Sequence, residues 1–151
     1  MASEVVESLI AALKTFSAVT DLVGSGNDAR IYAWLKQDVT IPDNGTIIVE
    51  LDSTDHSNDL LGQGGLEYHD VNILCRAPTP AAATVLAEAI RVNGTDPGTG
   101  LAGYSATPID TLIDATLTDT TGPTPAARLD GSANGLFDVN MTWQVSQNEV
   151  V

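Results

Sequence analysis

The clearest pattern in this chain is a strict alternation of apolar and polar residues near its end. From Phe137 to Val145 every second residue is apolar, and the residues between them are Asp, Asn, Thr and Gln. A period of two is typical of a strand with one buried face. Shorter apolar or alternating runs recur earlier in the chain. The expected strands are 31–35, 46–52, 67–76, 112–119 and 137–145.

Two other segments have the 3.6-residue apolar period of amphipathic helices. The first covers residues 4–16, and a short helical turn at 17–24 follows it. The second begins after Thr79, whose hydroxyl can accept hydrogen bonds from the free amides of a first turn. It ends at the Asn93-Gly94 pair, which favours a left-handed turn. The apolar side of this second helix consists of Ala82, Val85, Leu86, Ala89 and Ile90.

Together these elements predict one α+β domain over residues 1–151. The order helix, strand, strand, strand, helix, strand, strand favours a mostly antiparallel sheet of about four to five strands, with the two main helices packed on one face. Three connecting segments are polar or rich in Gly, Thr and Pro, so we expect long surface loops there. These segments are 53–65, 95–108 and 120–135.

The charge balance limits the classes of partner. The chain has 20 Asp and Glu residues against 6 Lys and Arg residues, which gives a formal net charge of −14. The few cations are widely separated, whereas direct binding to nucleic acid needs clusters of them. The single cysteine, Cys75, falls on the apolar side of a predicted strand and fits a core residue in a reducing cytoplasm. No run near the start is long and apolar enough to predict a signal peptide or a membrane span.

No motif predicts an enzyme, a cofactor or a metal. Residues 52–59 gather oxygen ligands around His56, but their spacing lacks the pattern of a calcium loop. We place His69 on the face opposite Val71 and expect it to be exposed or at an interface, without the paired ligands of a zinc site. The glycines of 98–103 match the letters of a dinucleotide fingerprint, but they follow a helix where that fingerprint requires a strand.

Most of the chain follows one arrangement of features in order. These are an amphipathic helix ending near Leu22-Val23-Gly24, the strand Arg30-Ile31-Tyr32, the run Ile47-Ile48-Val49 that leads to a polar arm, the strand 71–75, a helix ending at 87–91 and the closing strand 137–145. This arrangement resembles the tail-terminator or tail-completion proteins of long-tailed bacteriophages. The loops 95–108 and 120–135 are longer here than in the usual pattern of that family.

The resemblance implies a structural role in the virion without catalysis. Such a protein forms a ring of about six copies that caps the tail tube, ends tube polymerisation and presents a surface to the head-side connector protein. DNA passes through the ring without specific binding. The implied location is the head–tail junction of the virion, with the host cytoplasm as the place of assembly.

Two sets of residues are candidate sites within this ring. Exposed paired leucines usually mark a contact, so we expect the polar arm to touch a neighbouring subunit or the tube protein. The candidate contact residues are His56, Asp59, Leu60 and Leu61. An acidic channel wall would repel DNA and let it slide. The candidate channel-facing acids are Asp52 and Asp55.

Other classes of protein fit the same features. The chain would also suit a tail tube subunit or a head–tail connector subunit, because such virion proteins are small, β-rich and oligomeric. From a different class, it would suit a small acidic binding module, or an enzyme with an unfamiliar site at 52–59.

Overall fold

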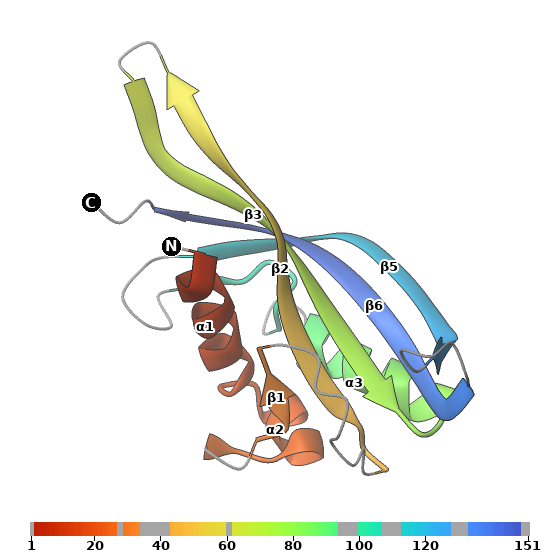
Figure 1. Ribbon diagram of the computed structural model, residues 1–151. Helices are drawn as coiled ribbons and strands as arrows, with labels where there is room; N and C mark the ends of the chain where they lie inside the picture. The colour runs from red at the N-terminus through yellow and green to blue at the C-terminus, as the bar shows by residue number, and fades with distance from the viewer. Residues whose placement is uncertain are drawn as a thin grey trace.

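The computed structural model describes residues 2–26, 29–33, 43–59, 62–93, 100–106, 113–127 and 133–148 (Figure 1). Helices and strands follow one another in the expected order. In chain order they are α1 (Ala2–Leu13), α2 (Ser17–Val23), β1 (Ile31–Tyr32), β2 (Thr46–Asp59), β3 (Gly62–Ala77), α3 (Pro80–Val92), β4 (Ser105–Ala106), β5 (Ile113–Ala127) and β6 (Ala133–Asn148).

One sheet connects all of the described strands in the order β1-β2-β3-β6-β5-β4. β1 runs parallel to β2, and each of the other neighbouring pairs is antiparallel. This confirms the predicted α+β class with a mostly antiparallel sheet. The described part of the sheet has six strands, because the two-residue strand β4, which was not expected, joins one edge beside the five expected strands.

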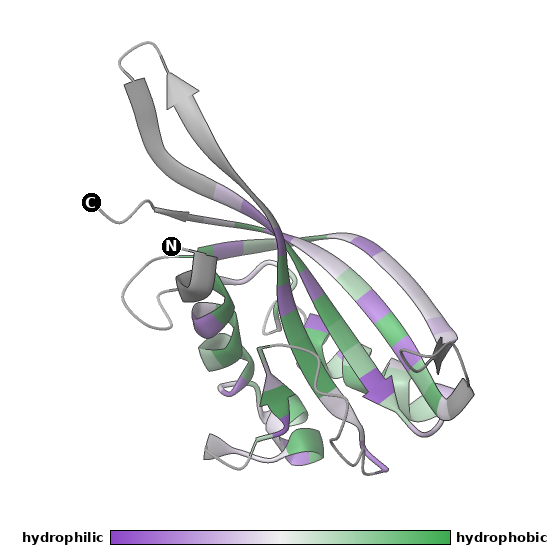
Figure 2. Cartoon of the chain, in the orientation of Figure 1, coloured by the Kyte–Doolittle hydropathy of each residue, from purple (hydrophilic) through white to green (hydrophobic). Residues whose placement is uncertain are grey.

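One face of the sheet, which we call the helix-covered face, carries the core. Along this face the register aligns Ile47 with Cys75 and Val139, and Val49 with Ile73 and Met141; all six side chains are at most 3% exposed. α1 packs against β2, and α3 packs against β3, β5 and β6, as predicted for the two main helices. Figure 2 shows hydrophobic residues gathered in the helices and in the central parts of β2 and β3. Burial of each large aliphatic side chain there contributes about 1.5–3 kcal/mol of transfer free energy.

Helix α3 has the boundaries that its sequence predicts. The Thr79 hydroxyl accepts a hydrogen bond from the Ala82 amide at 3.1 Å, and Pro80 occupies the first turn. At the other end Asn93 is left-handed, with φ 52°, and its amide donates to the Ala89 carbonyl. The Asn93 side chain also accepts a hydrogen bond from the Ala18 amide at 2.9 Å. α2 has no cap from its own N-cap residue, so Asn93 serves as the cap of a second helix.

Two of the expected loops are largely strand. β2 continues to Asp59 and β3 starts at Gly62, so most of 53–65 forms a paired two-stranded arm rather than a loop. β5 and β6 likewise cover most of 120–135. The prediction of loops from the polar composition of these segments was wrong. Pairing between strands satisfies the backbone hydrogen bonds even where the side chains are polar. Register shifts between Thr121 and Thr124, and between Pro125 and Ala127, accommodate the prolines of β5.

The third expected loop, 95–108, falls mostly outside the described residues. Its described part, 100–106, contains the short strand β4. The first predicted helix ends at Leu13 rather than at residue 16, and the predicted helical turn at 17–24 is α2, with Phe16 in an extended conformation between them.

Asn93 offers a test of the link between α2 and α3. Asn93→Gly keeps the left-handed turn but removes the cap of α2, and we expect it to lower the free energy of unfolding by about 1 kcal/mol. Asn93→Ala loses the cap and also strains the turn, so we expect a further loss of about 1 kcal/mol. Urea denaturation measures both values. If Asn93→Gly is as stable as the parent protein, the cap contributes nothing.

Candidate interaction surfaces

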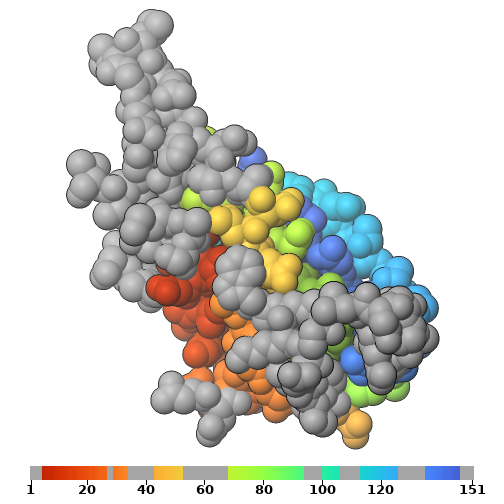
Figure 3. Space-filling view, viewed as in Figure 1, coloured from red at the N-terminus to blue at the C-terminus, as the bar shows by residue number. Residues whose placement is uncertain are grey.

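The face of the sheet opposite the helices, which we call the open face, is polar and mostly acidic. Figure 3 shows β2, β3, β6 and β5 side by side on the surface there. The strand register places Glu50, Asp70, Asp114, Asp119 and Asp138 on this face. Arg76 is its single cation among the described residues. At one end of the face, Thr46 and Ile48 are buried.

Arg76 is neutralised by a bidentate ion pair with Asp138. Its Nε lies 2.8 Å from Oδ1 and its Nη2 lies 3.0 Å from Oδ2, and the two side chains are 11% and 15% exposed. The hydrogen bond that Arg76 donates to Asp138 raises the pKa of Arg76, and the nearby charge of Glu50 adds to this effect. The pair joins β3 to β6. The remaining acids therefore determine the charge of the open face.

Neutral hydrogen bonds continue this polar layer towards β5. The Thr142 hydroxyl donates to the side-chain oxygen of Asn72 at 3.1 Å, which joins β6 to β3. The Thr118 hydroxyl donates to the Thr142 carbonyl at 2.9 Å, which joins β5 to β6. Side chains held in this way lose little further entropy when another surface approaches them.

The candidate channel-facing acids lie on β2. Asp52 is exposed, next to a register shift between Leu51 and Ser53. Asp55 lies farther along the arm, where its backbone is in register with Tyr68 of β3. The two acids therefore belong to one strand, with Asp52 at the irregularity where the arm begins.

The candidate contact residues belong to the arm. His56 is in register with Glu67, and Asp59 is in register with Gly62 near the end of the pairing. Leu60 and Leu61 lie outside the described residues. Figure 1 shows that the paired arm of β2 and β3 extends beyond the other elements. Such an arm can reach a second molecule without any change in the body of the fold.

The expectation for His69 was wrong. Its side chain is fully buried, and it lies on the helix-covered face in register with Val145. His69 precedes Val71 by two residues, so the two side chains share one face of the strand. The alternation of apolar and polar residues along the strand was enough to predict that His69 lies on the buried face. A buried imidazole at this position belongs to the core rather than to an interface.

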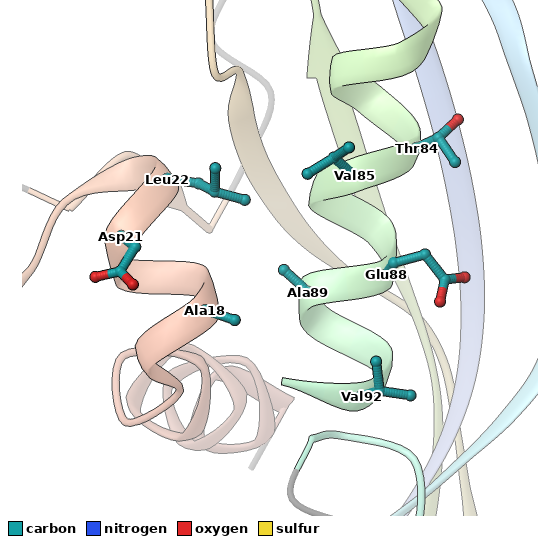
Figure 4. Close-up of a pocket in the computed structure, with 8 residues that line it drawn as sticks. All are labelled: Ala18, Asp21, Leu22, Thr84, Val85, Glu88, Ala89 and Val92. Carbon is teal, nitrogen blue, oxygen red and sulfur yellow. The ribbon is translucent and has the colours of Figure 1, made fainter. Parts of the chain in front are cut away.

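A groove between α2 and α3 was not predicted. Its volume is about 450 Å³. It is lined by Ala18, Asp21, Leu22, Thr84, Val85, Glu88, Ala89 and Val92 (Figure 4). Val85 is 54% exposed although it belongs to the apolar side of the helix. Glu88 pairs with Arg91 at 2.8 Å, and the hydrogen bond from Arg91 lowers the pKa of Glu88. Helical spacing could not show that Val85 lies at the margin of the buried stripe.

Cys75 and the acids provide no evident reactive centre. Cys75 is fully buried, and burial raises the pKa of its thiol far above neutral pH, so the thiolate form is scarce. Within the described ranges, no three side chains among His, Cys, Asp and Glu are grouped so that they could hold a metal ion. None of the described helices is long and apolar enough to cross a membrane.

Comparison with known proteins gives a likeness of fold. No protein-family model matches the chain, and no curated protein does so. Among solved structures, the chain is similar to a chain of the "Virion of native gene transfer agent (GTA) particle". The TM-score is 0.59 at 14% sequence identity, and the match covers 95% of this chain and 93% of that chain. The α+β fold described above is therefore one that also occurs in a virion particle.

The ion pair between Arg76 and Asp138 offers a test of how the open face is held. Asp138→Ala leaves a nearly buried guanidinium without its partner, and we expect it to cost about 2–3 kcal/mol of the free energy of unfolding. The double variant Arg76→Met with Asp138→Leu removes both charges and should recover most of that loss. Chemical denaturation of Arg76→Met, of Asp138→Leu and of the double variant gives the coupling. Additive losses would show that the pair does not act as a unit.

Proposed function

We propose that this protein is a structural component of a virion that caps the tail tube as a ring. In this role it ends tube polymerisation and forms the tail side of the head–tail junction. The observation that carries the proposal is the fold shared with a virion chain over 95% of the sequence. The resemblance in the order of elements to tail-terminator proteins supports the finer role. The proposal requires no catalysis.

The two faces of the sheet suit different positions in such a ring. The helix-covered face is occupied by the core, whereas the open face presents exposed acids such as Asp114 and Asp119. A ring whose open faces point inward would have a negatively charged channel, to which each copy brings a chain of net charge −14. DNA would be repelled from such a wall and would slide through without specific binding.

The arm suits contact between molecules. A strand rises about 3.3 Å per residue, so the segment 53–59 spans about 20 Å, enough to reach a neighbouring subunit or tube ring. His56, Asp59, Leu60 and Leu61 are the proposed contact residues. The proposed partners are further copies of the chain, the tail tube protein and the head-side connector protein. The proposed location is the head–tail junction, with assembly in the host cytoplasm.

Tube elongation in vitro tests the capping role. Added to growing tail tubes, the protein should stop elongation at amounts far below one copy per tube subunit, because only tube ends are bound. Leu60→Asp combined with Leu61→Asp should abolish this arrest, since two charges replace the apolar contact of the arm. Thr84→Ser, at an exposed position on α3, is the control and should arrest growth normally. Continued elongation in the presence of the unaltered protein would contradict the capping role.

The acidic channel is tested by removal of charge. Asp52→Asn with Asp114→Asn neutralises two exposed acids proposed to face the channel, and particles carrying it should release DNA more slowly because the wall repels DNA less. Glu7→Gln with Asp21→Asn removes two exposed acids from the helices and should leave the rate unchanged. DNA ejection followed over time measures the difference. Equal rates for both double variants would exclude the electrostatic role.

The form that the purified protein adopts alone distinguishes a terminator from the nearest alternative, a tail tube subunit. A tail tube subunit polymerises by itself, whereas a terminator forms a closed ring and stops. Tubes formed by the purified protein alone would therefore favour a tube subunit over a cap.

A further inference from the structure

Among the described residues, no strand pairs with the outer edge of β5 over most of its length. β4 pairs with β5 only at Ala106–Ile113 and Ser105–Asp114, and the Ala115 amide donates to the Tyr104 carbonyl at 3.1 Å. Beyond this point, no described residue pairs with that edge of the strand. Figure 1 shows β5 at the margin of the sheet, and residues 118–125 are exposed. An edge of this kind presents a row of backbone donors and acceptors to another strand.

The first half of this edge is well suited to pairing. Residues 116–121 are Thr, Leu, Thr, Asp, Thr and Thr, so four of the six are β-branched and only Asp119 is charged. Natural edges are usually protected by lysine or proline. Here the prolines are Pro123 and Pro125, which leave 116–121 without that protection. The register shift between Leu117 and Asp119 is the one irregularity in this half.

The opposite edge of the sheet is also without a partner strand over most of its length, within the described ranges. β1 pairs with β2 only at Ile47 and Ile48. From Val49 to the end of the arm, no described strand lies on that side of β2. This edge is acidic, because Glu50, Asp52 and Asp55 belong to it. Two copies of the β2 edge would therefore repel each other, whereas the β5 edge offers an acidic strand a neighbour with a single charge.

We propose that residues 116–121 of β5 pair with the β2 edge, residues 49–59, of the next copy of the chain. This inference rests on the proposed ring and names the contact that builds it. Pairing of two different edges is a head-to-tail contact, and such a contact builds a ring when its rotation closes around an axis. It continues the sheet from one subunit to the next through backbone hydrogen bonds. The open faces of successive copies then form one continuous acidic surface.

Charge substitutions at the β5 edge test the identity of the partner strand. Thr116→Asp with Thr121→Asp places two acids beside the acidic β2 edge, and the concentration required for half-assembly should rise about tenfold. Thr116→Lys with Thr121→Lys should lower that concentration, because lysine attracts the same partner. Ala81 and Thr84 are exposed on α3 and receive the same substitutions as controls for net charge. Sedimentation across a concentration series, with or without tail tubes, measures assembly.

The possible results distinguish failure of the proposed contact between β5 and β2 from failure of the proposed ring. Weaker assembly with aspartate and stronger assembly with lysine, beyond the controls, supports the pairing of β5 with β2. Weaker assembly with both indicates that β5 pairs with β5 of a second copy, which overturns the inference. Rings that form equally from all variants also overturn it but leave the capping role intact. An unaltered protein that stays monomeric even on tail tubes contradicts the ring and, with it, this contact.

Hydrogen exchange gives an independent readout at the same residues. In the assembled ring, the outward amides of 116–121 should exchange more slowly than in the monomer, because they donate to the neighbouring strand. The protected amides of α3 serve as the reference, since their hydrogen bonds lie within one copy. Unchanged exchange at 116–121 in rings of normal size would overturn the proposed pairing.

Discussion

The constraint on which the rest of this structure depends is that the sheet buries only one of its faces. Trp143 is fully buried at the centre of β6, in register with Val71 on one side and Leu117 on the other. All three side chains are on the helix-covered face. The helices bury the apolar face of the four long strands. The opposite face of the sheet therefore does not need to be apolar. The open face can therefore carry charge at little cost to stability.

This asymmetry explains how a chain of net charge −14 forms a compact fold. Among the described residues, Asp114 and Asp119 are exposed on the open face, and Glu7 and Asp21 are exposed on the helices, where water screens their repulsion. Two of the described arginines join separate elements: Arg76 pairs with Asp138, and Arg30 donates to the carbonyls of Leu22 and Gly45 at 2.7 and 3.3 Å. These cations hold elements together, while exposed acids such as Asp114 and Asp119 lie on a surface that can meet a partner.

Much of the fold could be predicted from local patterns. The alternation of 137–145 identified β6, and Thr79 and Asn93 marked both ends of α3, because these signals depend on only a few neighbouring residues. The arm and the second half of β5 were missed since their polar and proline-containing sequences depend on pairing with a distant partner for their strand structure. Polarity alone cannot distinguish a solvated loop from a hairpin that is exposed on both faces.

The candidate surfaces were predicted less completely. Composition indicated an acidic exterior, but only the strand register could gather Glu50, Asp70 and Asp114 on one face. The groove at Val85 and the edge of β5 result from the positions of neighbouring helices and strands in the fold. The apolar periodicity of a single segment does not predict those positions. His69 is different, since its burial followed from the period of the strand. The single-domain boundary and the contact residues of the arm remain predictions.

The central claim is that copies of this chain close into a ring at the end of a tail tube. The most direct measurement is the mass of the purified protein by light scattering, combined with negative-stain images taken with and without tail tubes. We predict closed rings of about six copies, either free or seated at tube ends. Monomers that never gather at tube ends, or open tubes made by the protein alone, would contradict the account.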